Sequence, residues 1–135
     1  MFSEKVINVL YVDDEHYNVH SFTSSFRRIF NVYTASSISD AETILTVQDI
    51  HVMIVEQHMS TMAGLKFLME SLSKYPNVVR ILLTTLCDKQ DLIDAINKAQ
   101  VFRYVEKPWD SDELQKFITE GYAFYKGHII RVSSC

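Results

Sequence analysis

Two hydrophobic periods alternate along the chain. Short runs that are apolar at nearly every position are each followed by a longer stretch in which apolar residues recur every three or four positions. The first pattern is typical of strands buried on both faces, and the second of amphipathic helices that cover a sheet. The predicted strands are residues 6–12, 31–35, 50–55, 78–83 and 102–105.

Each predicted strand precedes a predicted helix with one apolar face. Ser37 or Ser39 is the expected N-cap of the second helix. The third begins at Gly64 and ends near Tyr75-Pro76, because the residue before a proline disfavours helix. The fourth and fifth cover 88–99 and 110 to about 125. In chain order, the inward-facing residues are Val19, Phe22, Phe26 and Ile29; Ala41, Ile44 and Leu45; Leu65, Leu68, Met69 and Leu72; Leu92, Ile93 and Ile96; Leu114, Phe117, Ile118 and Tyr122.

This alternation of strands and helices predicts an α/β fold. Five βα units with right-handed crossovers give a three-layer, doubly wound parallel sheet in a single domain. We expect the domain to span residues 1–126, with 127–135 as a C-terminal tail or the start of a linker. In such folds ligands bind beyond the carboxyl ends of the strands.

Composition narrows the function classes. The 135 residues carry a net charge of -4 and form no basic stripe, which argues against nucleic-acid binding by this domain. Cys87 and Cys135 suit neither a zinc motif nor a disulfide framework. Neither a signal peptide nor an apolar run of the roughly 20 residues that span a bilayer is evident, so we expect a cytoplasmic protein without membrane contact.

Chemically active side chains follow the predicted strands. Asp13 and Asp14 close the first strand, Glu56 the third, Thr84 the fourth and Lys107 the fifth. Because the carboxyl ends of parallel strands share one edge of the sheet, these residues are expected to meet.

Together these residues predict a metal and phosphoryl site. Adjacent carboxylates such as Asp13 and Asp14 repel each other, and a hard cation such as Mg2+ relieves that repulsion. Glu56 and the backbone carbonyl of His58 are the further metal ligands that we expect. The ammonium of Lys107 suits a phosphoryl group or a carboxylate, and the Thr84 hydroxyl suits a phosphoryl oxygen.

The ordered set of motifs resembles the receiver domain of two-component response regulators. The resemblance covers about residues 6 to 125, and the set in this order is specific although each motif alone is weak. The matching stretches are residues 10–15, 59–64, 81–85 and 107–109.

The resemblance implies a fold and a set of roles. The fold would be flavodoxin-like, with strand order 2-1-3-4-5. Asp13 and Asp14 would hold Mg2+, and an aspartate after the third strand would take a phosphoryl group from a histidine kinase or phosphotransfer protein. Thr84 and Lys107 would then bind the phosphoryl oxygens, and Tyr104 would move with the switch. In an active-like state Thr84 is drawn inward and Tyr104 is buried.

The resemblance also implies a backbone feature and a set of partners. The peptide bond between Lys107 and Pro108 would be cis. The expected partners are a fused or separate output domain and a second copy of the chain, bound through the last two helices and the fifth strand.

The sequence departs from this family pattern at the reacting position. Glu56 stands where the phosphoacceptor aspartate is expected, Ser60 where proline is usual, Ala63 where an acidic residue is frequent, and Thr85 where a small residue follows the switch threonine. Glutamate places its carboxylate roughly 1.5 Å further out. A displacement of about 1 Å costs on the order of a hundredfold in such a transfer.

Three functions therefore remain open. The first is an atypical receiver that signals without phosphorylation, and the second a conventional acceptor with slow transfer. The third, a Mg2+-dependent phosphohydrolase, lacks a nucleophilic aspartate beyond the Asp13-Asp14 pair, so we expect no enzyme activity. An ion pair between Glu56 and Lys107 that only stabilises the fold is compatible with the first function, the atypical receiver. His16 and His20 have zinc-ligand spacing, but exposed helix residues are the better interpretation because no third ligand is evident.

Overall fold

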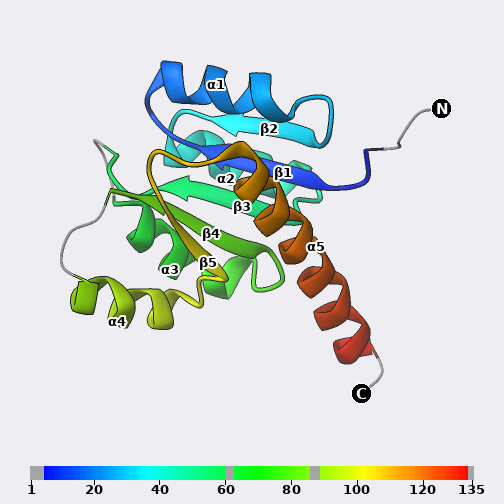
Figure 1. Cartoon of the computed structure of the whole chain (residues 1–135). Helices are drawn as coiled ribbons and strands as arrows, with labels where there is room; N and C mark the ends of the chain where they lie inside the picture. Colours follow the sequence, from blue (N-terminus) through cyan, green and yellow to red (C-terminus); the bar gives the residue numbers. More distant parts are fainter. Residues whose placement is uncertain (1–4, 60–62, 86–88, 134–135) are drawn as a thin grey trace.

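The computed structural model describes residues 5–59, 63–85 and 89–133, and these form a five-stranded parallel sheet flanked by helices (Figure 1). The strand order is β2-β1-β3-β4-β5, as the family resemblance implied. The strands are β1 (Asn8–Val12), β2 (Asn31–Ala35), β3 (Val52–Glu56), β4 (Val79–Thr84) and β5 (Arg103–Glu106). The helices are α1 (His16–Phe26), α2 (Ile38–Val47), α3 (Gly64–Lys74), α4 (Lys89–Ala99) and α5 (Ser111–Ser133).

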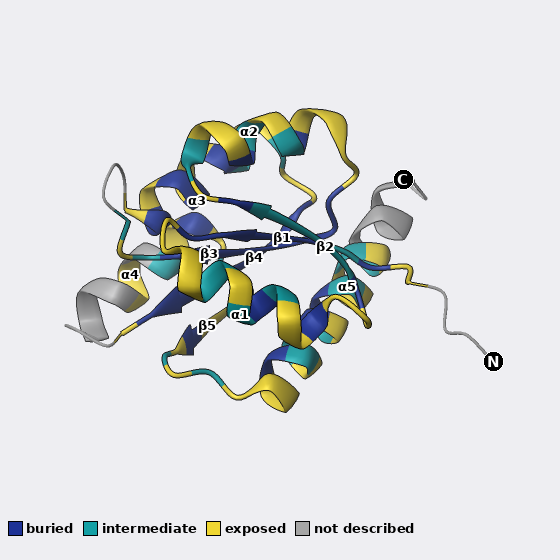
Figure 2. Cartoon of the chain, turned by 90° about the horizontal axis from the view of Figure 1, so that it is seen from above, coloured by how far each residue is buried: buried dark blue, intermediate teal, exposed yellow. Residues whose placement is uncertain are grey.

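Two hydrophobic clusters lie on opposite faces of the sheet and confirm the three-layer prediction. Consecutive strand residues point to opposite faces, so Leu10 belongs to one cluster and Tyr11 to the other. Helices α2, α3 and α4 contribute to the cluster around Leu10, and α1 and α5 to the cluster around Tyr11. Figure 2 shows these two helical layers on either side of the buried central strands. Because both faces are covered, the central strands read as continuous apolar runs.

The strand register brings the predicted functional residues to one edge. Val12 of β1 is level with Val55 of β3, Glu56 with Leu83 of β4, and Thr84 with Glu106 of β5. Asp13 and Lys107 follow directly after the ends of β1 and β5. The carboxyl edge of the sheet therefore carries the candidate site, as expected.

Two helix ends follow the predicted signals, and a third does not. Ser37 is the N-cap of α2, since its hydroxyl accepts a hydrogen bond from the Asp40 N–H at 3.0 Å, and α3 ends at Lys74 just before Tyr75. Helix α5 continues past the expected end near Tyr125 to Ser133. No proline interrupts that stretch, and the single Gly127 costs only about 1 kcal/mol within a helix. Residues 127–133 are thus helical, while the domain boundary at 126 stays a prediction.

Several residues predicted to face inward do not. Ile29 lies beyond the end of α1 and is exposed. Met69 is exposed because it lies one position, or about 100° around the helix, beyond the buried Leu68. Ile93 of α4 is exposed, whereas Ala99 at the end of the same helix is buried. The side chain of Leu92 lies outside the described residues. Within the described part of the chain, no helix is long and apolar enough to span a bilayer.

Candidate functional site

Glu56 is buried at the carboxyl end of β3, with only 3% of its surface exposed. The start of α3 is tied to the end of β3, because the Gly64 N–H donates a hydrogen bond to the Gln57 carbonyl at 2.9 Å. A Cβ atom on Gly64 would lie 2.1 Å from the Glu56 carbonyl oxygen, so only glycine permits this approach of α3 to β3. The Gln57 side chain also accepts a hydrogen bond from the Leu65 N–H at 2.7 Å. These contacts fix the backbone that carries Glu56.

The Glu56 carboxylate has partners for both oxygens. Oε1 forms an ion pair with the Nζ of Lys107, and Oε2 accepts a hydrogen bond from the His58 N–H at 3.1 Å. Lys107 is positioned by its own N–H, which donates to the Thr84 carbonyl at 3.0 Å. The Lys107–Pro108 peptide bond is cis, which confirms that expectation. The structure therefore pairs the lysine ammonium with the carboxylate that stands where the family pattern has its phosphoacceptor.

The Asp13 carboxylate is held by three hydrogen bonds. The Tyr11 hydroxyl and the Asn18 amide donate to Oδ2 at 2.9 and 3.1 Å, and the Glu15 N–H donates to Oδ1 at 3.0 Å. Burial raises the pKa of the Tyr11 hydroxyl far above its ordinary value, and the charges of Asp13 and, more weakly, Glu56 raise it further. Tyr11 therefore stays a neutral donor to Asp13 at any physiological pH.

The acidic pair, Glu56 and Lys107 share one open cavity of about 250 Å³. Asp13, Asp14, Glu15, Asn18, Glu56, His58, Thr85 and Lys107 line it. The structure thus brings together most of the residues that the sequence singled out, although their roles in function stay predictions.

Two predicted switch residues do not reach this cavity. Thr84 is fully buried, and its hydroxyl donates to the Thr85 carbonyl at 2.9 Å. Thr85, at the position where the family has a small residue, lines the cavity instead. Tyr104 is exposed on β5. The arrangement therefore differs from the active-like state, in which Tyr104 is buried.

Carboxylate and carbonyl oxygens are the ligands that Mg2+ prefers, and the residues of the acidic pair offer them. However, no three His, Cys, Asp or Glu side chains converge closely enough to hold a metal ion in the described part of the chain. The Glu56 carboxylate is already paired with Lys107. The expected set with Glu56 as a third carboxylate ligand is thus not assembled here, and Mg2+ binding stays a prediction. His16 and His20 are exposed on α1.

The sequence reasoning missed three residues of the site. Tyr11 had a usable signal, because a tyrosine inside an aliphatic strand needs a partner for its hydroxyl. Asn18 had no signal that the sequence could reveal, since an asparagine in the first turns of a helix is common. Thr85 was seen only as a departure from the family pattern, and its place in the cavity wall follows from the end of β4. Ser60, the other loop departure, lies outside the described residues.

The fold and the site together define a doubly wound α/β domain with acidic residues and a lysine at the switch-point edge of its sheet. The family model of the response regulator receiver domain matches residues 9–119. The chain belongs to this family, whose members act in two-component signalling.

Curated relatives and solved structures agree with this assignment. The hydrogenase transcriptional regulatory proteins HoxA of Cupriavidus necator and Bradyrhizobium diazoefficiens are 34% and 28% identical over 83% and 87% of this chain. The chain spans only 23% and 24% of their length, about a quarter of each.

A response regulator receiver domain protein from Clostridium thermocellum is 26% identical, with a TM-score of 0.82 over 90% of this chain and 98% of that one. A structure described as adenylate cyclase from Rhodopirellula baltica is 25% identical, with a TM-score of 0.87 over 93% and 94% of the two chains.

Proposed function

We propose that this chain is an atypical receiver module that signals without phosphorylation at Glu56. The observation that carries the proposal is the buried ion pair between Glu56 and Lys107. In the family pattern the lysine binds a phosphoryl oxygen, and here it already binds a carboxylate of the chain itself. The longer glutamate side chain brings that carboxylate to the lysine without any modification.

Physical chemistry supports a partial mimic of the phosphorylated state. A carboxylate delivers about one negative charge, whereas a phosphoryl group delivers nearly two. The Thr84 hydroxyl does not line the cavity, and Tyr104 is exposed, so only the lysine contact is made. We therefore propose that the ion pair holds the domain in an inactive-like arrangement and that a binding partner changes this arrangement.

The same arrangement bears on Mg2+. We propose that the metal binds through Asp13, Asp14 and the His58 carbonyl, with Glu56 held away from it by Lys107. Mg2+ would neutralise the acidic pair there. Titration of Mg2+ against the fluorescence of the single Trp109 tests this, because Trp109 follows Lys107-Pro108 and packs on Phe26 at 5.7 Å. Saturable quenching that persists in Glu56→Gln is expected, and loss of binding in Glu56→Gln would contradict the assignment.

We further propose the cytoplasm as its place of action and a histidine kinase or phosphotransfer protein as its input partner. The HoxA relatives are transcriptional regulators about four times as long as the matched region, which supports an output domain, fused or separate. The contact face for that domain, or for a second copy, would be α4, β5 and α5, where Ile93 and Tyr104 are exposed. We assign no enzymatic activity to the domain. Turnover of a generic phosphoester would contradict that assignment.

Intact mass after incubation with acetyl phosphate and Mg2+ tests the proposal. The native chain is expected to gain no phosphate. Glu56→Asp is the matched variant, since it shortens the side chain and leaves Asp13, Asp14 and Lys107 in place; we expect it to gain one phosphate. A stoichiometric, hydroxylamine-sensitive phosphate on Glu56 of the native chain would contradict the proposal.

A second candidate function is a conventional acceptor with slow transfer. It is favoured by the acidic pair and the lysine, which share one cavity with Glu56. The time course of the same experiment separates the two functions. Slow but complete phosphorylation over hours supports the acceptor, and a mass that stays unchanged supports the phosphorylation-independent module.

A further inference from the structure

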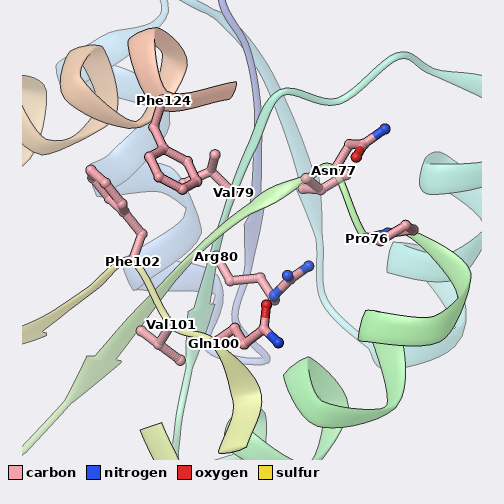
Figure 3. A pocket seen from close by; sticks show the side chains of 9 residues that line it. Pro76, Asn77, Val79, Arg80, Gln100, Val101, Phe102 and Phe124 are labelled. Carbon is pink, nitrogen blue, oxygen red and sulfur yellow. The ribbon is translucent and has the colours of Figure 1, made fainter. Parts of the chain in front are cut away.

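A second cavity lies at the opposite end of the sheet from Glu56. Its volume is about 370 Å³, and it is bounded by the start of β4, the segments before β4 and β5, and helix α5 (Figure 3). A volume of this size falls in the range of small-molecule sites. Asn77, Arg80, Gln100, Phe102 and Phe124 are the lining residues that matter here.

Arg80 is the unusual residue of this cavity. Only 4% of its surface is exposed, although arginine is almost never fully buried without a partner of opposite charge. None of the ion pairs among the described residues includes Arg80, and no lining residue is acidic. Burial lowers the pKa of its guanidinium, and no neighbouring charge offsets this. Among the described residues, the guanidinium is therefore a buried cation without an anion.

A purely structural role accounts for part of the arrangement. The Arg80 Nη1 donates to the Tyr75 carbonyl at 3.1 Å, and Nε donates to the Ala99 carbonyl at 3.3 Å. These carbonyls lie at the C-terminal ends of α3 and α4, whose dipoles favour a positive charge. The two bonds use two of the five N–H donors of a guanidinium. Figure 3 shows the end of the Arg80 side chain beside Gln100, on the wall of the cavity.

Apolar side chains, two of them aromatic, make up most of the remaining lining. The rings of Phe102 and Phe124 lie 5.4 Å apart at 43°, and Phe124 is half exposed at the mouth of the cavity. Aromatic rings contact a planar apolar body with little loss of side-chain freedom. The amides of Asn77 and Gln100 add polar groups at the rim.

We propose that this cavity binds a small organic anion, with its carboxylate or phosphate against Arg80 and a flat apolar body against Phe102 and Phe124. The planar fork of a guanidinium matches the two oxygens of either anionic group. Binding supplies the negative charge that the buried arginine lacks. The proposal is independent of the role of Glu56, because the two sites lie at opposite ends of the strands.

The test uses a matched set of probes on the whole chain, followed by backbone amide NMR shifts and calorimetry. 2-Naphthoate and 2-naphthyl phosphate share the body and differ in the anion, 2-naphthylmethanol is neutral, and inorganic phosphate lacks the body. Both aromatic anions are expected to bind saturably and to shift the amides of Asn77, Arg80 and Phe102. The neutral probe and inorganic phosphate should each bind at least about tenfold more weakly, as expected when charged hydrogen bonds or apolar contacts are lost. Whichever of the two probes binds with the higher affinity shows whether the site prefers a carboxylate or a phosphate.

Two variants and a control locate the site. Arg80→Gln should weaken both aromatic anions at least about tenfold and leave the neutral probe unchanged. Phe124→Ala, which keeps the Arg80 contacts and a good helix former on α5, should weaken every aromatic probe several-fold. Met69→Ala, on the exposed face of α3, is the control and should bind as the native chain does.

Several results would overturn the proposal. They are the absence of saturable binding, equal binding of the neutral probe, and shifts spread over the whole chain. Unchanged anion affinity in Phe124→Ala would also overturn it, even if Arg80→Gln fails to fold.

Discussion

Two buried charges at opposite ends of one sheet are stabilised in different ways. At the carboxyl end, Glu56 meets the ammonium of Lys107 and the N–H of His58. At the other end, Arg80 donates to the carbonyls of Tyr75 and Ala99. Within the part of the chain that the structure describes, the first charge has a counter-charge, and the second has backbone dipoles alone.

The comparison shows two ways in which this fold accommodates a buried charge. A buried carboxylate that lacks a cation favours whatever cation or positive ligand can reach it. By pairing Glu56 with Lys107, the chain satisfies internally the lysine that a phosphoryl group would use. Arg80 has no such anion among the described residues, and a cavity opens beside it. Removing the partner of Glu56 and removing the charge of Arg80 should therefore lower the free energy of unfolding by unequal amounts.

The largest effect is expected for Lys107→Met. This change leaves the Glu56 carboxylate buried without its cation, and breaking a buried pair from one side costs about 3 kcal/mol or more. The free energy of unfolding, from urea titration followed by circular dichroism, should fall by about that amount. The double variant Glu56→Gln with Lys107→Met should recover most of it, because the neutral amide still accepts from the His58 N–H.

A double variant as unstable as Lys107→Met alone would contradict this. The loss would then come from the packing of the lysine chain rather than from the orphaned charge.

A smaller effect is expected for Arg80→Met. This change removes the charge itself and leaves only two carbonyls without donors, at a cost of about 1–2 kcal/mol. The same urea titration measures it beside Lys107→Met. A loss larger than that of Lys107→Met would show that the carbonyls of α3 and α4 stabilise Arg80 better than Lys107 stabilises Glu56, and the comparison would reverse.

Sequence patterns predicted the carboxyl end of the sheet far better than the other end. The apolar strand runs located Asp13, Glu56 and Lys107, because each follows directly after a run and parallel strands align their ends. No such rule applies to Arg80. An arginine within the run from Val78 to Leu83 gives no sign of whether it reaches solvent, and its carbonyl partners come from the ends of two helices.

Side-chain direction limited the prediction of the site itself. Thr84 and Thr85 are neighbours at the end of β4, and only Thr85 lines the cavity. Which of two adjacent residues faces a site depends on where the strand ends, and sequence patterns place such ends only to within a few residues. The same uncertainty hid the length of α5, whose continuation to Ser133 depends on the absence of a stop signal.

The smallest effect concerns His51, another buried titratable group, which lies at the Arg80 end. Its Nδ1 accepts a hydrogen bond from the Asn8 N–H at 2.9 Å, and the rings of Tyr122 and Tyr125 pack against it at 5.0 and 4.9 Å. Burial lowers the pKa of His51 below its ordinary 6.5, and the exposed Asp49 carboxylate, 3.8 Å from Nε2, offsets only part of this.

Protonation of His51 would therefore destabilise the fold. The unfolded chain binds the proton more readily, so the free energy of unfolding should fall as the pH drops below about 6.5, with a slope of at most about 1.4 kcal/mol per pH unit. His51→Gln keeps an acceptor for the Asn8 N–H and cannot be protonated, so its stability should change less over pH 5–7. The other four histidines, His16, His20, His58 and His128, are present in both the native chain and the variant, so their contributions cancel. Parallel pH profiles of the native chain and His51→Gln would mean that this end of the sheet accepts a second positive charge beside Arg80. The view that Arg80 needs an anion would then be contradicted.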